Sequence, residues 1–315
     1  MNEQIKETMT FLSQNYTPLI EIHLKENKKI YLGNKGKRKC RFCGKEKPEV
    51  TFRKRAHAIP EFTGNNKLFS YYECDTCNER ISSLMESHMA NYMNIWHTFS
   101  KVSGKRGVPS FKTNAKKSRV DLLNGHLHIE DDEEDKITEV DEENKQIKIT
   151  ASMATYILIA VYKCLTKMAI TIMPEKELDK FKDTLDWLKE DNHNKSKYKL
   201  KDLYLLFSFA EGIKPFAFQS CFLYKRKEKH KDNVPYMLFL MAYHNFVFQI
   251  YLPLCSEDKK LFGQKVTTKF IPTPIDLKDG KIERWKIDLS STENVKGEKA
   301  TITMKGEKII IGNNI

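Results

Sequence analysis

Cys40-Arg-Phe-Cys43 and Cys74-Asp-Thr-Cys77 are two CxxC pairs separated by 30 residues. Each pair can place two thiolates on one metal ion from a tight turn, and two pairs complete a closed tetrahedral site, the arrangement that structural zinc prefers. A closed site leaves no open position for water. We therefore expect Cys40, Cys43, Cys74 and Cys77 to hold a structural Zn²⁺, which supplies on the order of 10 kcal/mol of folding free energy in isolated zinc peptides.

The composition is that of a folded chain. Its 315 residues are enough for one large domain or two ordinary ones, and 40% of them are hydrophobic. The seven cysteines are an odd number and no apolar signal core lies near the N-terminus, which argues against a disulfide framework. The most apolar stretch, residues 151–173, is interrupted by Lys163 and Lys167. We expect no membrane span and a cytoplasmic location.

The net charge of +12 lies within residues 1–120, because the remaining residues carry equal numbers of acidic and basic side chains. Basic charge confined to one segment is typical of a protein that binds a polyanion such as nucleic acid. The alternative interpretation is a lysine-rich surface that only keeps the protein soluble. Charge alone does not choose between the two.

The residues between the two CxxC pairs are more numerous than a minimal zinc ribbon needs. They contain Arg53-Lys-Arg-Ala-His57-Ala-Ile-Pro60 and a turn at Gly64-Asn65, and Asn78 directly follows the second pair at the start of a helix predicted to run to about residue 99. A histidine placed between a basic strand and an Ile-Pro turn is hard to explain by packing. Imidazole suits general-base chemistry because its pKa lies near neutral pH.

Residues 40–95 resemble the HNH nuclease family, specifically its treble-clef members with two zinc knuckles. The family pattern is a CxxC, a histidine followed by Ile-Pro, a glycine turn, and a second CxxC with Asn or His directly after it. The motifs quoted above match this pattern in order and spacing over about a fifth of the chain. The resemblance implies an α+β protein with an N-terminal zinc-stapled ββα-metal (treble-clef) HNH domain. The His-x-Ile-Pro form also resembles nuclease effectors of bacterial anti-phage defence systems.

The resemblance implies roles for two residues. His57 would deprotonate the water that attacks phosphorus. Asn78 would ligate one divalent cation, Mg²⁺ or Mn²⁺, which polarises the phosphate and stabilises the leaving oxygen. Many family members carry a second metal ligand directly before the histidine, where this chain has Ala56.

Other residues are candidates for the missing ligand and for phosphate contacts. We expect Glu86 as the second ligand, although a regular helix would place it about 80° around the axis from Asn78. Glu61 and Glu79 are further candidates. The basic side chains that lead into the histidine strand are predicted phosphate contacts, namely Arg53, Lys54 and Arg55.

The rest of the chain is predicted to be a second unit. We expect an HNH nuclease domain at residues 1–105, a basic linker at 106–120, and an α+β domain at 121–315 with a regulatory, sensing or oligomerisation role. The acidic stretch from Glu130 to Glu143 is predicted to be a surface turn. Helices are predicted at 151–173 and 175–191. Strands are predicted at 216–224, 236–252, 269–272, 282–287, 300–304 and 308–311.

The sequence therefore predicts a metal-dependent endonuclease that hydrolyses phosphodiester bonds of DNA, with double-stranded DNA as the expected substrate. A homo-oligomer and an activating ligand or partner protein at the C-terminal domain are further expectations. The alternative is a non-catalytic zinc-finger DNA-binding or scaffold protein, for which Ala56 is the best support. RNA cleavage is a third alternative, because the fold contacts mainly backbone phosphates.

Overall fold

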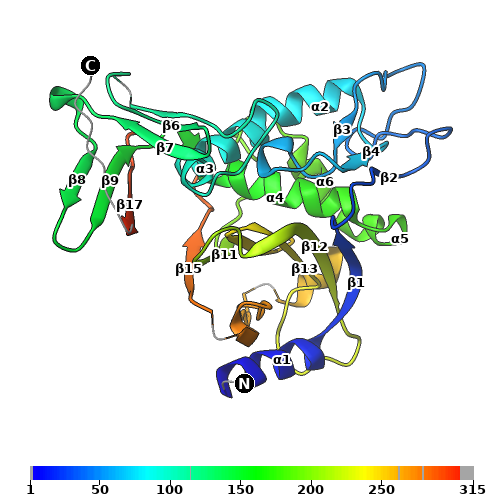
Figure 1. Cartoon of the computed structure of the whole chain (residues 1–315). Coiled ribbons are helices and arrows are strands. Elements are labelled where there is room, and N and C mark those ends of the chain that lie inside the picture. Colours follow the sequence, from blue (N-terminus) through cyan, green and yellow to red (C-terminus); the bar gives the residue numbers. More distant parts are fainter. Residues whose placement is uncertain (1–2, 114, 262, 279, 306–315) are drawn as a thin grey trace.

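A six-stranded antiparallel sheet forms the centre of the C-terminal half (Figure 1). The computed structural model describes residues 3–113, 115–261, 263–278 and 280–305. The strands, in spatial order, are β1 (Tyr16–His23), β12 (Phe216–Arg226), β13 (Met237–His244), β14 (Phe246–Tyr251), β11 (Tyr204–Ala210) and β15 (Ile282–Asp288). Mixed helices and strands confirm the predicted α+β class.

The two faces of this sheet belong to different hydrophobic clusters. Side chains such as Phe239 and Met241 pack toward helix α4 (Leu158–Ile172), whereas Leu238 and Leu240 pack with Phe11 of α1 (Glu3–Asn15). Successive strand residues point to opposite faces, so neighbours in the chain join different clusters. Figure 1 shows the result, with α4 above the sheet and α1 below it.

The edge strand β1 comes from the N-terminal segment. It pairs along β12 from Tyr16 opposite Arg226 to His23 opposite Ser220. A strand that precedes the zinc-knuckle segment in the chain thus belongs to the sheet of the C-terminal half. We retain the division at residues 1–105, 106–120 and 121–315 as a proposal about the roles of these parts.

The zinc-knuckle segment contains a small sheet and a long helix. The sheet order is β2 (Ile30–Leu32), β4 (Leu68–Ser70) and β3 (Ala56–His57), and the 3₁₀ turn η1 (Glu61–Thr63) follows β3. The helix consists of α2 (Asp75–Ile81), the π-helical turn η2 (Ser82–Glu86) and α3 (Ser87–Phe99). Its buried face carries four side chains with no exposed surface, Ile81, Met85, Met89 and Met93.

Helix α4 lies between the long helix and the central sheet (Figure 1). All its residues except Leu158 are buried, including Lys163 and Lys167. The predicted helix at 151–173 was too long at its start, because residues up to Ser152 form strand β9, which pairs with β17. Among the described residues, no helix has the length and apolar character needed to cross a membrane.

The remaining elements form smaller sheets and turns. The predicted helix at 175–191 is divided into α5 (Glu175–Leu178), η4 (Asp179–Phe181) and α6 (Lys182–Leu188). The other strands are β5 (Phe111–Lys112), β6 (Arg119–Leu123), β7 (His126–Glu130), β8 (Thr138–Asp141), β9 (Gln146–Ser152), β10 (Tyr156–Ile157), β16 (Asn294–Val295) and β17 (Lys299–Lys305). The other 3₁₀ turns are η3 (Glu133–Asp135), η5 (Ser256–Leu261) and η6 (Asp276–Lys278).

The predicted strand at residues 269–272 is wrong, because these residues do not form a strand. The side chain of Gln249 bonds the carbonyl of Lys269 and the N–H of Ile271 there, so a side chain takes the place of a strand partner. The predicted strand at 308–311 lies outside the described residues.

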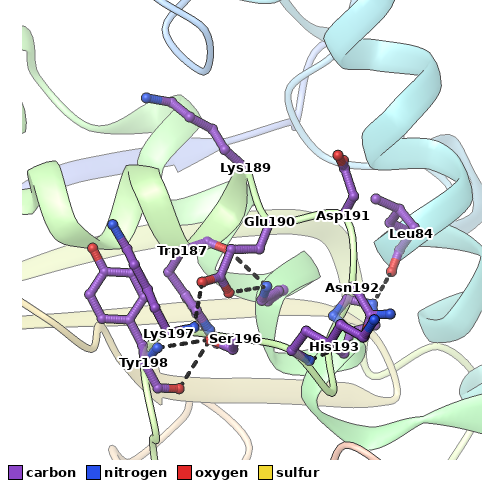
Figure 2. A network of polar contacts seen from close by, with 12 residues as sticks. Leu84, Trp187, Lys189, Glu190, Asp191, Asn192, His193, Ser196, Lys197 and Tyr198 are labelled. Atoms are coloured by element: carbon purple, nitrogen blue, oxygen red, sulfur yellow. Dashed lines mark hydrogen bonds and ion pairs between the residues drawn. The ribbon is translucent and has the colours of Figure 1, made fainter.

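The loop that follows α6, residues 189–198, contacts the long helix at its π-helical turn (Figure 2). His193 Nε2 lies 3.0 Å from the carbonyl oxygen of Leu84 in the π-helical turn. Glu190 lies 3.5 Å from Lys163 Nζ of α4, which also donates a hydrogen bond to the Trp187 carbonyl. The loop therefore joins the long helix to α4 through polar contacts.

Candidate active site

The four cysteines of the two CxxC pairs form one cluster. All four Sγ atoms lie within 4.8 Å of one another, and Cys40, Cys74 and Cys77 are buried. A hydrogen bond from the Cys77 thiol, helped by backbone N–H groups, lowers the pKa of Cys40 to about 5 despite burial. Thiolate is the form that binds metal. The predicted cluster is confirmed, and its four-sulfur donor set suggests a structural zinc ion.

The carboxylate of Asp75, at the start of α2, fixes the basic segment that leads into β3. It accepts hydrogen bonds from the Thr51 hydroxyl at 2.5 Å, the Arg53 N–H at 2.9 Å and the Lys54 N–H at 2.8 Å. A carboxylate is also favourable at a helix N-terminus. Because the backbone is held here, Arg53, Lys54 and Arg55 present their exposed side chains from a defined position.

Asn65 holds the loop that follows His57. Its Nδ2 donates to the carbonyls of Ile59 at 2.5 Å and Leu68 at 2.9 Å, while its Oδ1 accepts from the N–H groups of Lys67 and Leu68. The preceding Gly64 has a φ of +86°, a left-handed conformation that favours glycine. Sequence reasoning treated Asn65 only as a turn residue, whereas its buried amide ties together both ends of the loop.

His57 lies half-buried on β3 and contacts the ring of Phe69 with a centroid distance of 4.8 Å. Its Nε2 is 3.6 Å from a carboxylate oxygen of Glu61. Burial lowers the pKa of His57 below its usual value, and the carboxylates of Glu61 and Glu86 oppose this shift. The imidazole is therefore mainly neutral at pH 7, the form that can accept a proton.

Lys167 of α4 reaches the site from the other half of the chain. Its fully buried Nζ lies 3.2 Å from the His57 carbonyl oxygen, 3.0 Å from Glu73 Oε2 and 3.5 Å from Glu86 Oε1. Burial alone would lower the pKa of Lys167, but the two carboxylates raise it above its usual value. Burial also raises the pKa of Glu73 to about 7. The ammonium thus links the histidine strand to the helix that carries Glu86.

Lys167 was missed by the sequence reasoning, which noted it only as an interruption of an apolar stretch. One signal was available. A lysine inside a buried helix needs an acidic partner, because an unpaired buried charge is costly. The identity of that partner depends on how the helices dock and has no local pattern.

The π-helical turn changes the position of Glu86 around the helix. The N–H of Ser87 bonds the carbonyl of Ser82, five residues back, so each residue of this turn rotates the chain less than in an α-helix. The offset between Glu86 and Asn78 is therefore smaller than the roughly 80° of a regular helix. This turn brings the two side chains closer to one face.

The other candidate metal ligands differ in their surroundings. Asn78 is half-buried, and its side-chain amide makes no hydrogen bond within the described part of the chain. Glu79 is exposed and pairs with Lys54. The carboxylates of Glu61 and Glu86 raise the pKa of His57, so they remain the candidate metal ligands beside it. Ala56, only 2% exposed, brings no ligand atom.

Paired zinc knuckles, a histidine strand, an asparagine-fixed loop and a following helix define a ββα unit with a candidate metal centre. Residues 40–93 match the family model described as HNH endonuclease. This confirms the predicted family for that segment and suggests a nuclease that uses a divalent metal and acts on nucleic acid. No curated protein and no solved structure matches the chain.

Replacing a zinc-site cysteine tests the metal assignment. We expect Cys77→Ser to lose the single zinc ion per chain and to lower the free energy of unfolding by on the order of 4–5 kcal/mol, because metal binding and folding are coupled. Elemental analysis and denaturant unfolding measure the two effects. Cys255→Ala, which changes a buried cysteine outside the cluster, should keep the zinc. One zinc ion retained in Cys77→Ser, with unchanged stability, would contradict the assignment.

Proposed function

We propose that the protein is a divalent-metal-dependent endonuclease that hydrolyses phosphodiester bonds of DNA, with His57 as the general base. The observation that carries the proposal is the grouping of His57, Glu61 and Glu86 inside the segment that also holds the four-cysteine cluster and matches HNH endonucleases. A neutral imidazole flanked by carboxylates is suited to metal-assisted hydrolysis.

In the proposed reaction, His57 accepts the proton of the attacking water as the water oxygen bonds to phosphorus and the bond to the leaving oxygen breaks. The 3.6 Å between His57 Nε2 and Glu61 Oε2 exceeds a direct hydrogen bond, so Glu61 acts on the imidazole through its charge. Asn78 and Glu86, with Glu61 as the alternative, would hold Mg²⁺ or Mn²⁺. When bound, that cation polarises the phosphate and stabilises the leaving oxygen.

The substrate assignment rests on charge. Arg53, Lys54 and Arg55 are exposed beside the histidine strand and would contact phosphates, with duplex DNA as the expected partner. The rival is a non-catalytic zinc-finger protein, favoured by the buried Ala56 in place of a usual ligand. Metal-dependent cutting separates the two.

We further propose that the C-terminal part controls the nuclease and that the protein serves in anti-phage defence. The second idea is supported only by the form of the His57 motif. The first is supported by a cavity of about 1010 Å³ between α3 and the central sheet, lined by rings that include Trp96, Phe207 and Trp285. An activating ligand in this cavity would contact the helix that continues from the metal site.

Replacing the histidine tests the nuclease. We expect His57→Ala to cut plasmid DNA about 100-fold more slowly or worse than the wild type with Mg²⁺ or Mn²⁺, because it lacks the general base. Nicking is followed on gels at equal zinc content. His126→Ala, an exposed histidine on β7, is the matched control and should cut normally. Equal cutting by wild type and His57→Ala would remove His57 from the mechanism.

The pH dependence tests the state of His57. Burial lowers its pKa, so the deprotonated base persists to lower pH, and we expect the acid limb of kcat/KM to have its midpoint below pH 6.5. Glu61→Gln removes a carboxylate that raises this pKa and should move the midpoint further down. Glu79→Gln, whose carboxylate pairs with Lys54, should leave it unchanged. An upward shift in Glu61→Gln would contradict the assigned electrostatics.

The defence role has its own test. Bacteria that express the wild type should give fewer phage plaques than bacteria that express His57→Ala at the same level, because only the former can cut DNA. Plaque counts over a panel of phages measure this. Equal counts with every phage, with a cutting enzyme in vitro, would count against defence while leaving the nuclease intact.

A further inference from the structure

One face of the small sheet carries a row of rings that ends at His57. Tyr31 of β2 is paired with Phe69 of β4, and Phe69 is paired with His57 of β3. Directly paired residues lie on the same face of a sheet. The Tyr31 and Phe69 rings stack at 5.2 Å, and the Phe69 and His57 rings meet edge-on at 4.8 Å. The candidate base is thus continuous with an aromatic surface.

Tyr71 and two arginines extend this surface. The Tyr71 ring stacks on Tyr31 with centroids 5.1 Å apart and planes 15° from parallel. The guanidinium of Arg38 lies 4.7 Å from the Tyr71 ring, and that of Arg55 lies 4.9 Å from the Phe69 ring. We call Tyr31, Phe69 and Tyr71 the aromatic row. Positive charge is present at both ends of it.

Two rings of the aromatic row, Tyr31 and Tyr71, line a hollow of about 290 Å³. Five basic side chains line the hollow: Lys35, Arg38, Arg53, Lys54 and Arg55. The acidic side chain in the lining is Glu73, which is 2% exposed and paired with Lys167. Glu79, which does not line the hollow, forms an ion pair with Lys54. Tyr31 lines the hollow and is 37% exposed, against 3% for Phe69, so it is the accessible ring of this pair. The hollow is both cationic and aromatic.

We propose that this hollow binds an unpaired nucleotide of the DNA strand, with its base stacked on Tyr31 and its phosphates held by the basic side chains. The inference rests on the proposed nuclease function and narrows its substrate to DNA that is single-stranded or opened beside the cleavage site. Phosphate contacts alone require no rings. In a duplex, the base faces are covered by their neighbours, so an exposed tyrosine gains stacking only from an unstacked base.

The test measures binding without cutting. Full-length, zinc-loaded protein is titrated into a labelled single-stranded oligonucleotide and, separately, into a hairpin duplex, without Mg²⁺ or Mn²⁺ and at one salt concentration, with anisotropy as the readout. We expect tighter binding of the single strand. Tyr31→Leu should weaken single-strand binding by about 5- to 100-fold, because base–ring stacking is lost, and should change duplex binding less than twofold.

Three further variants separate stacking from folding and from charge. Tyr224→Leu is the matched control, since Tyr224 is a half-buried tyrosine of β12 that stacks on a strand phenylalanine, Phe222, in the cluster that packs against α1; the variant should bind both DNAs normally. Tyr31→Phe keeps the ring and should keep single-strand binding, so a loss there would overturn the stacking assignment. Arg38→Gln should reduce the salt dependence of binding, which Tyr31→Leu should not.

Several outcomes overturn the inference. These are duplex binding at least as tight as single-strand binding, an equal loss on both DNAs in Tyr31→Leu, or no loss at all. Failure of the proposed nuclease is seen separately, by adding Mg²⁺ or Mn²⁺. A wild type that never cuts, but binds single strands through Tyr31, loses the nuclease and keeps the binding site. A wild type that cuts without single-strand preference keeps the nuclease and loses the inference.

Discussion

The buried ammonium of Lys167 is the constraint on which the candidate site depends. It contacts the carbonyl oxygen of His57, the carboxylate of Glu73 just before the long helix and the carboxylate of Glu86 within that helix. A buried charge is tolerated only when its partners are in place, so strand, helix and α4 must assemble together. The cysteine cluster fixes the two knuckles to each other. The lysine then fixes the knuckles to the rest of the protein, and Arg41 adds bonds from the first knuckle to three carbonyls at the end of α4.

Local patterns predicted a large part of this arrangement. The spacing of the cysteines, the strand and turn around His57 and the helical periodicity after Cys77 each involve residues close in sequence, and these local structures are found where expected. Long-range features were not predictable in this way. The pairing of β1 with β12 joins residues about 200 positions apart, and the partners of Lys167 come from β3, the loop before α2 and the π-helical turn. Contacts between such distant residues depend on how the helices and strands pack together. A short stretch of sequence carries no information about that packing.

The zinc-knuckle segment and the C-terminal half share one hydrophobic core. Ile81, Met85 and Met89 of the long helix belong to the same cluster as Phe239 and Met241 of the central sheet. The aromatic cavity beside α3 lies along this shared boundary. A change in packing on the sheet side would therefore be transmitted to the helix that carries the candidate metal ligands, because close-packed interiors transmit strain.

Because of the π-helical turn, the long helix holds one residue more than a regular helix would at this point. A ring closed by a bond to the fifth preceding residue holds one more residue than an α-helical ring. Deleting one residue between Cys77 and Glu86 would let the helix close in the ordinary way and would leave the downstream helix at nearly the same angle, because the turn that holds the extra residue rotates less per residue. A chain that is one residue shorter in this stretch is thus expected to keep a carboxylate on the same face of the helix, and in an alignment the gap belongs inside the turn.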